Sequence, residues 1–144
     1  MTLNLIKLCV GAASVEDLEQ WIEFTQAERR KAGLPAEQIH TTRQSPKRVD
    51  DILPDGSLYW VIKGVIQARQ KLIDIRSYTD GQGIPRCDLV MEPKLILTEP
   101  MRRGPFQGWR YYEPKDAPRD LVRNAATAAL PPEFVRELAG LGLL

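Results

Sequence analysis

The pattern of apolar and polar positions along the chain predicts a series of strands. Residues 3–10 are rich in Leu, Ile and Val and end at Gly11, which is typical of a buried strand. Residues 58–63 combine aromatic and β-branched side chains, which favour strands. Shorter apolar segments predict further strands at residues 38–43, 86–91 and 94–98. Pro93 separates the last two and indicates a sheet edge or a bend there.

One long helix is predicted near the N-terminus. Ser14 is suited to the N-cap, and Glu16 and Asp17 would place negative charge in the first turn, where the helix dipole favours it. Apolar and small residues recur at helical spacing and predict one buried stripe, formed by Val15, Leu18, Trp21, Ile22 and Thr25. Basic residues at 29–31 and Gly33 mark the end of this helix.

Residues 65–76 fit two patterns. A helical stripe would contain Val65, Ala68, Leu72 and Ile75, whereas residues 66, 68, 70 and 72 alternate as in a strand. Gly64 alone connects this segment to the preceding strand, and so short a connection favours a continuing or paired strand. A short turn of helix is predicted at residues 49–52.

The C-terminal part of the chain is expected to be helical. A loop at residues 113–118 precedes a short helix at 120–129, and a last helix after Pro132 would carry an apolar face of Phe134, Val135, Leu138 and Leu141. We therefore expect one domain over residues 1–144, with a helical extension from about residue 117. The expected fold class is α+β, with a mainly antiparallel sheet curled into a small open barrel.

Composition excludes several classes of site. The 20 Lys and Arg residues nearly balance 19 Asp and Glu residues, so an anion site must come from local clustering. Two distant cysteines and one histidine do not supply a Cys/His zinc site, and no metal or cofactor is expected. The apolar run at the N-terminus is too short for a signal sequence or a membrane span, which favours a cytoplasmic protein with reduced thiols.

The segment at residues 102–112 is the strongest candidate for function. It contains three arginines, four aromatic rings and two glycines, a combination suited to gripping a planar or anionic ligand. Arginines would pair with phosphate while Trp109 stacks on a base. The full set of candidate ligand-binding or nucleic-acid-binding residues is Arg102, Arg103, Trp109, Arg110, Arg43, Lys47, Arg48, Trp60 and Arg69. The alternative is that Phe106, Trp109 and Tyr111 belong to the core and the arginines are merely solvated.

Signatures of catalysis are sparse. The sequence contains no G-x-S-x-G, G-x-G-x-x-G or P-loop motif. The leading hypothesis is therefore a non-enzymatic module that binds RNA or a modified nucleotide. A second hypothesis is a small enzyme acting on an anionic metabolite, with Arg110 and Lys63 orienting the substrate and His40 or Asp88 as acid or base. A third is a subunit that docks on a partner through its C-terminal apolar helix.

Three strings carry a resemblance to a known family: GSLYWVIKG at residues 56–64, ARQ at 68–70 and PFQGWRY at 105–111. They resemble a family of small bacterial proteins known as domain of unknown function 1489, over nearly the whole chain. That resemblance implies no activity. The order of predicted elements up to residue 63 is also similar to PUA-like domains (ASCH, EVE and YTH), although Ser57 stands where those domains have an acidic residue. This similarity implies binding of RNA or modified bases in an aromatic-lined mouth.

Overall fold

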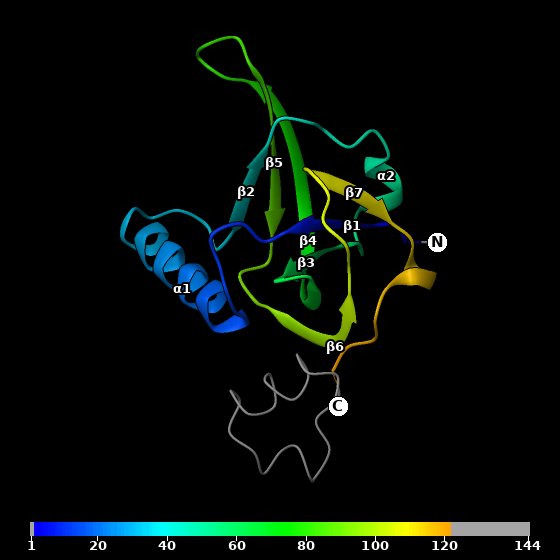
Figure 1. The fold of residues 1–144 in the computed structure, drawn as a ribbon. Coiled ribbons are helices and arrows are strands. Elements are labelled where there is room, and N and C mark those ends of the chain that lie inside the picture. The colour runs from blue at the N-terminus through cyan, green and yellow to red at the C-terminus, as the bar shows by residue number, and fades with distance from the viewer. Residues whose placement is uncertain (1, 122–144) are drawn as a thin grey trace.

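The computed structural model describes residues 2–121 and contains seven strands, with one main helix at the side of the sheet (Figure 1). The elements in chain order are β1 (Asn4–Leu8), α1 (Val15–Lys31), β2 (Gln38–Thr42), α2 (Val49–Ile52), β3 (Ser57–Ile62), β4 (Val65–Thr79), β5 (Pro85–Met91), β6 (Ile96–Arg102), β7 (Trp109–Tyr112) and the short 3-10 helix η1 (Pro114–Asp116). The α+β class and every predicted strand up to residue 112 are confirmed. The expected helices after residue 120 lie almost wholly outside the described residues.

The sheet is mainly antiparallel, as predicted, but it does not close into a barrel. Its strand order is β2-β5-β4-β3-β1-β7, and β6 pairs with β4 outside this path. Only β1 and β3 pair in parallel among the described strands. Within residues 2–121, β2 pairs only with β5 and β7 only with β1, so the two ends of the sheet stay open.

Strand β4 links two parts of the sheet. Its first half pairs with β3 and β6, and its second half pairs with β5 after a bulge between Leu72 and Asp74. The resulting β4–β5 hairpin projects from the rest of the molecule (Figure 1). Lys63 and Gly64 form the connection before β4, both with positive φ (50° and 76°). A two-residue turn of this kind returns the chain as a hairpin, which explains why the strand pattern prevails over the helical one.

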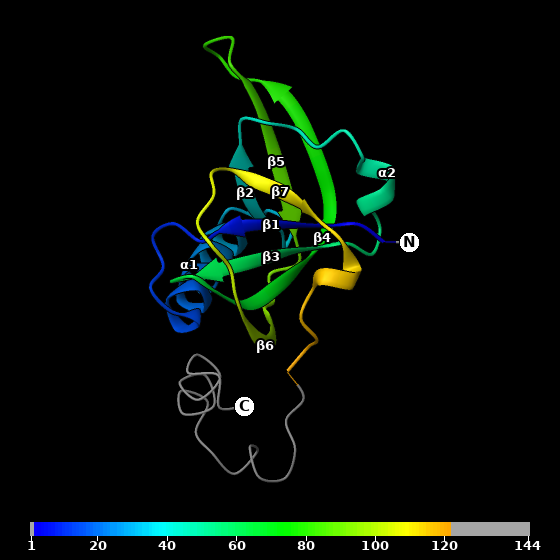
Figure 2. The same ribbon diagram turned by 45° about the vertical axis from the view of Figure 1, so that its right-hand side comes forward.

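Two apolar clusters cover the two faces of β3, which is buried along its whole length. The larger cluster packs α1 against one face and includes Leu5, Leu58, Leu72 and Leu89. The smaller cluster on the other face is formed by Ile6, Tyr59, Val61, Ile66 and Tyr112, with Phe106 and Ala117 packed against it. Figure 2 shows β7, β1 and β3 side by side, as their pairing requires.

Helix α1 begins as predicted and differs in its buried stripe. The backbone N–H of Asp17 donates to Ser14 Oγ (3.2 Å), which confirms Ser14 as the N-cap. The buried residues are Val15, Leu18, Ile22 and Gln26, whereas Trp21 is 56% exposed. The prediction that Trp21 is buried was wrong, because a helical turn of 100° per residue carries position 21 away from the stripe through 18 and 22. None of the described helices is long and apolar enough to cross a membrane.

Candidate functional site

Side chains of β7 bridge the gap between the two ends of the sheet. The indole N–H of Trp109 donates to the backbone carbonyl of Gln44 (2.8 Å). The Tyr111 hydroxyl accepts the backbone N–H groups of Lys47 (2.8 Å) and Arg48 (3.3 Å). The loop that follows β2 is therefore held against β7, although the two strands do not pair.

A pocket of about 470 Å³ lies where the loop after β2 meets β7. Its lining residues come from β1, β2, the loop after β2, the β6–β7 loop and β7: Lys7, Thr41, Thr42, Arg43, Gln44, Gln107, Gly108, Trp109 and Arg110. We call it the basic groove, because Lys7, Arg43 and Arg110 line it and no carboxylate does. Among the described residues, none of these three cations forms an ion pair. Such a site attracts an anion.

The aromatic ring of Phe106 connects the basic groove to further arginines. The guanidinium carbon of Arg110 lies 5.6 Å from the ring centre and that of Arg103 lies 5.1 Å from it. The backbone N–H of Arg103 donates to the carbonyl of Gly64 (2.9 Å), and Arg102 pairs with Val65. The arginines predicted from the 102–112 segment thus lie near one another, next to the β3–β4 turn.

The two tryptophans predicted as ligand-binding residues lie in the core. Trp109 is 5% exposed and Trp60 is 4% exposed. The indole N–H of Trp60 donates to Gln70 Oε1 (2.8 Å), just as that of Trp109 is occupied by Gln44. Neither ring therefore offers an open face on which a base could stack. Trp109 lies in the core, as the alternative interpretation of its segment expected. Of the other rings, Phe106 is half-buried and Tyr111 is exposed.

The remaining predicted residues divide into paired and unpaired cations. Arg69 holds Asp120 through two bonds (2.8 and 2.9 Å) and also donates to Ser57 Oγ (2.7 Å). The guanidinium of Arg69 lowers the pKa of Asp120 below its usual value. Arg48 pairs with Asp51 (3.0 Å). These two arginines are paired with carboxylates. The Lys47 side chain is exposed, and this residue contacts β7 through its backbone N–H, which donates to the Tyr111 hydroxyl.

Removal of the Tyr111 hydroxyl is expected to loosen the loop after β2. Tyr111→Phe keeps the ring and its edge contact with Trp109 (5.0 Å) but deletes the acceptor of two backbone N–H groups. We expect the free energy of unfolding to fall by about 1 kcal/mol and the amides of Lys47 and Arg48 to exchange faster with solvent. Urea unfolding and amide exchange by NMR measure both. Tyr78→Phe, which removes a hydroxyl on the β4–β5 hairpin, is the control; unchanged exchange in Tyr111→Phe would contradict the bridging role.

His40 and Asp88 do not form an acid–base pair. Asp88 is opposite Thr41 in the β2–β5 register and accepts the hydroxyls of Thr41 (2.8 Å) and Tyr78 (3.2 Å). His40 directly precedes Thr41 on β2 and therefore points to the other face, where its ring meets Trp60 edge-on with 5.5 Å between ring centres. Burial, with a smaller contribution from Lys7, lowers the pKa of His40 to about 4, so the imidazole is neutral at pH 7. Within residues 2–121, no three His, Cys, Asp or Glu side chains are placed to hold a metal ion.

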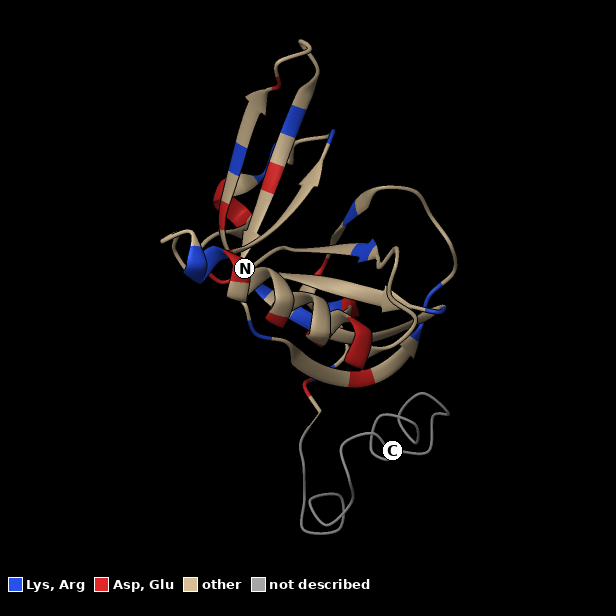
Figure 3. Ribbon diagram, turned by 90° about the vertical axis from the view of Figure 1, so that its left-hand side faces the viewer, with Lys and Arg blue, Asp and Glu red and all other residues tan. Residues whose placement is uncertain are grey.

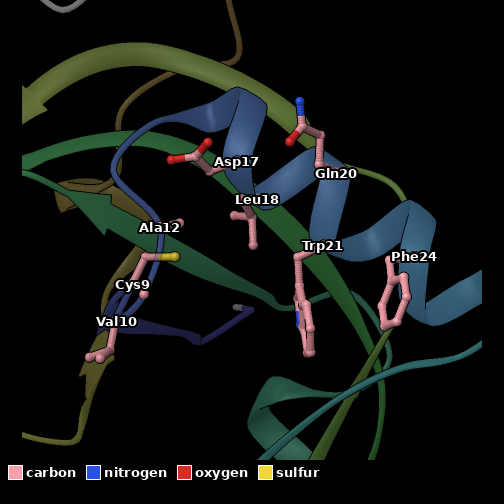
Figure 4. Close-up of a pocket in the computed structure, with 9 residues that line it drawn as sticks. Cys9, Val10, Ala12, Asp17, Leu18, Gln20, Trp21 and Phe24 are labelled. Atoms are coloured by element: carbon pink, nitrogen blue, oxygen red, sulfur yellow. The ribbon is translucent and has the colours of Figure 1, made fainter.

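A second hollow, which the sequence did not indicate, lies between α1 and the connection from β1. It measures about 770 Å³ and is lined by Cys9, Val10, Gly11, Ala12, Asp17, Leu18, Gln20, Trp21 and Phe24. The rings of Trp21 and Phe24 stack at 5.9 Å, and Figure 4 shows both pointing the same way from α1. The signal available in the sequence was Phe24, a large aromatic residue outside the predicted buried stripe.

The comparisons with known proteins give one match. The model of a family described as "Protein of unknown function (DUF1489)" matches residues 5–144. No curated protein and no solved structure matches the chain. The similarity to PUA-like domains consequently stays a prediction.

Proposed function

The chain belongs to this family of proteins of unknown function. Since the family assigns no activity, we propose a function from the structure: a non-enzymatic module that binds RNA or a modified nucleotide through phosphate. The observation that carries the proposal is the basic groove, in which Lys7, Arg43 and Arg110 surround one hollow without a carboxylate. Guanidinium groups match phosphate oxygens in geometry and charge. The unpaired cysteines Cys9 and Cys87 support a reducing, cytoplasmic setting.

The near-zero net charge of the chain does not weaken this proposal, because no carboxylate lines the basic groove and many carboxylates are paired with arginines elsewhere. Both signs occur together on β4 and β5 (Figure 3). Carboxylates far from the basic groove are already neutralised by arginines: Glu37 by Arg29 and Arg76, Asp74 by Arg76, Asp80 by Arg86 and Asp120 by Arg69. The lining of the groove itself carries three cations and no carboxylate, and the carboxylate nearest to it in the hydrogen-bond network is Asp88, which accepts the Thr41 hydroxyl (2.8 Å).

The extent of the basic surface favours a polyanion over a single phosphate. From Arg110 it continues past Phe106 to Arg103 and then to Arg102 at the end of β6. A row of separated cations follows a nucleic-acid backbone, which carries one charge per nucleotide on each strand. We include a PUA-like fold in the proposal, supported by the order of β1, α1, β2, α2 and β3 along the chain.

Arg43→Ala combined with Arg110→Ala is expected to weaken RNA binding. Loss of two phosphate contacts should lower affinity by about 10-fold or more at low salt and reduce the slope of log affinity against log salt by about 1.4. Fluorescence anisotropy of labelled single-stranded RNA and transfer-RNA-like hairpins across a salt series measures both values. Arg102→Ala with Arg103→Ala tests the extension of the surface in the same assay.

The matched control for this experiment is Arg30→Ala with Lys94→Ala. Both residues are exposed, neither lines the basic groove, and the variant loses the same net charge. It should bind RNA with nearly the wild-type affinity. If the groove variant and the control retain the same affinity and salt slope as the wild-type protein, or if the wild-type protein binds no RNA at low salt, the proposed function is wrong.

A further inference from the structure

The hollow beside α1 has the size and lining of a small-molecule site. Its volume of about 770 Å³ falls in the range of known ligand pockets. Val10 is 89% exposed, Trp21 56% and Phe24 59%, so three large apolar side chains face solvent around one hollow. Apolar surface gathered in this way marks a place where something binds. We call it the aromatic pocket.

The aromatic pocket continues inward to a buried polar atom. A smaller cavity of about 80 Å³ shares Cys9, Val10, Leu18 and Trp21 with it and reaches His40. The Nε2 atom of His40 is buried and has no hydrogen-bond partner among the described residues. An unpaired buried nitrogen is unfavourable, and a ligand group that bonds to it removes that penalty.

The lining of the inner cavity selects an uncharged, flat ligand. Besides His40 it contains the side chains of Gln38, Ile39, Trp60, Gln70 and Met91, and no charged residue. A charged group there would lose its hydration without gaining a partner. A planar ring can pack against Trp21, and a ring that carries both N–H donors and acceptor atoms (bare nitrogens or carbonyl oxygens) can bond to His40 Nε2 in either tautomer of the imidazole. Nucleobases have these properties.

The aromatic pocket and the basic groove are neighbours along the same two strands. On β1 and its continuation, Lys7 lines the groove and Cys9, two residues later on the same face, lines the pocket. On β2, His40 reaches the inner cavity and Thr41 and Thr42 line the groove. Two residues of a strand span roughly 7 Å. That separation suits the base and the phosphate of one nucleotide.

We propose that the aromatic pocket binds the base of the nucleotide whose phosphate the basic groove binds. Trp21 stacks on the ring, and His40 Nε2 forms a hydrogen bond with its edge. The inference rests on the proposed function, in which the basic groove binds the phosphate, and adds the aromatic pocket as a second, separate site for the base. It also supplies the aromatic stacking that the buried Trp109 does not provide.

Isothermal titration of the full chain with the four common ribonucleosides and their 5′-monophosphates tests this inference. We expect at least one monophosphate to bind, and its nucleoside to bind more weakly. Trp21→Ala should lower the affinity for both by about 10-fold or more, since stacking on an aromatic side chain contributes that much. Arg110→Ala should lower the affinity for the monophosphate and leave the nucleoside unchanged. Tyr78→Ala, at an exposed ring on the β4–β5 hairpin, is the control and should change neither.

A second variant separates the role of His40 from packing. His40→Phe retains a flat ring against Trp60 but removes the nitrogen, so it should fold and bind the nucleoside about 5-fold or more weakly. The inference is overturned if Trp21→Ala binds as the wild-type protein does, or if no nucleoside or monophosphate binds. Phosphate-dependent binding that needs Arg110 but not Trp21 would support the proposed function and contradict the base site in the aromatic pocket. Nucleoside binding that needs Trp21, with no effect of Arg43 or Arg110 on any ligand, would support the pocket and contradict the proposed function.

Discussion

Gly56→Ala is expected to lower the free energy of unfolding by at least about 3 kcal/mol, because an added methyl group has no room. A Cβ atom at this position would lie 2.5 Å from the backbone oxygens of both Ile52 and Leu3, and 2.9 Å from Ile52 Cγ2. The surrounding backbone is fixed by hydrogen bonds. The N–H of Gly56 donates to Ile52 O (2.6 Å), and the carbonyl of Gly56 accepts from Leu72 N (2.9 Å).

The effect of Gly56→Ala is measured by urea or thermal unfolding against a matched glycine. Gly81 lies in the β4–β5 loop, where an added Cβ would meet nothing within 4 Å. Gly81→Ala should leave the unfolding midpoint nearly unchanged. Equal midpoints for the two variants would show that the packing of α2 and of the chain before β1 against the start of β3 is looser than the structure has it.

Local sequence patterns were sufficient to place β1 to β6, because each of these strands carries its own apolar or alternating signal. Strand β7 (Trp109–Tyr112) was not predicted, because its segment was interpreted as a binding surface. The pairing of the strands depends on contacts between distant residues, which no local pattern contains. The division of β4 between β3 and β5 depends on the bulge at Leu72–Asp74, and the openness of the sheet depends on whether the distant strands β2 and β7 pair with each other. An alternating apolar pattern is the same in an open sheet and in a barrel.

The candidate site was partly predictable for a similar reason. Arg103 and Arg110 are close in sequence, so a single loop is enough to bring them together around Phe106, with Arg102 next to Arg103 at the end of β6. Arg43 and Lys7 join Arg110 only through the meeting of β1, the loop after β2 and β7. The sequence also did not distinguish an exposed tryptophan from a buried one. For Trp109 both positions were left open, and the structure buries it; Trp21 was predicted to be buried, and the structure exposes it.

Acidification from pH 7 to pH 5 is expected to destabilise the folded protein by about 2 kcal/mol through His40. Burial, and to a lesser extent Lys7, lowers the pKa of His40 from 6.5 to about 4. Between these two values the unfolded chain holds the proton and the folded chain does not. Stability therefore rises with pH across this window, by up to about 1.36 kcal/mol for each pH unit, and the loss is complete only below pH 4.

The pH window from 5 to 7 is well suited to isolating this effect, because His40 is the only histidine in the sequence. The carboxyl groups of Glu37, Asp80 and Asp120 have lowered pKa values, so their contribution to stability is lost only at lower pH. Cys9, whose pKa is raised to about 11, stays a neutral thiol throughout. Urea unfolding at pH 5, 6 and 7 should show a rise in stability for the wild-type protein and a nearly flat profile for His40→Phe. Parallel profiles for the wild-type protein and His40→Phe would mean that the imidazole takes up a proton as easily in the folded chain as in the unfolded one. His40 Nε2 would then not be buried, and the proposed hydrogen bond between it and a base would lose its support.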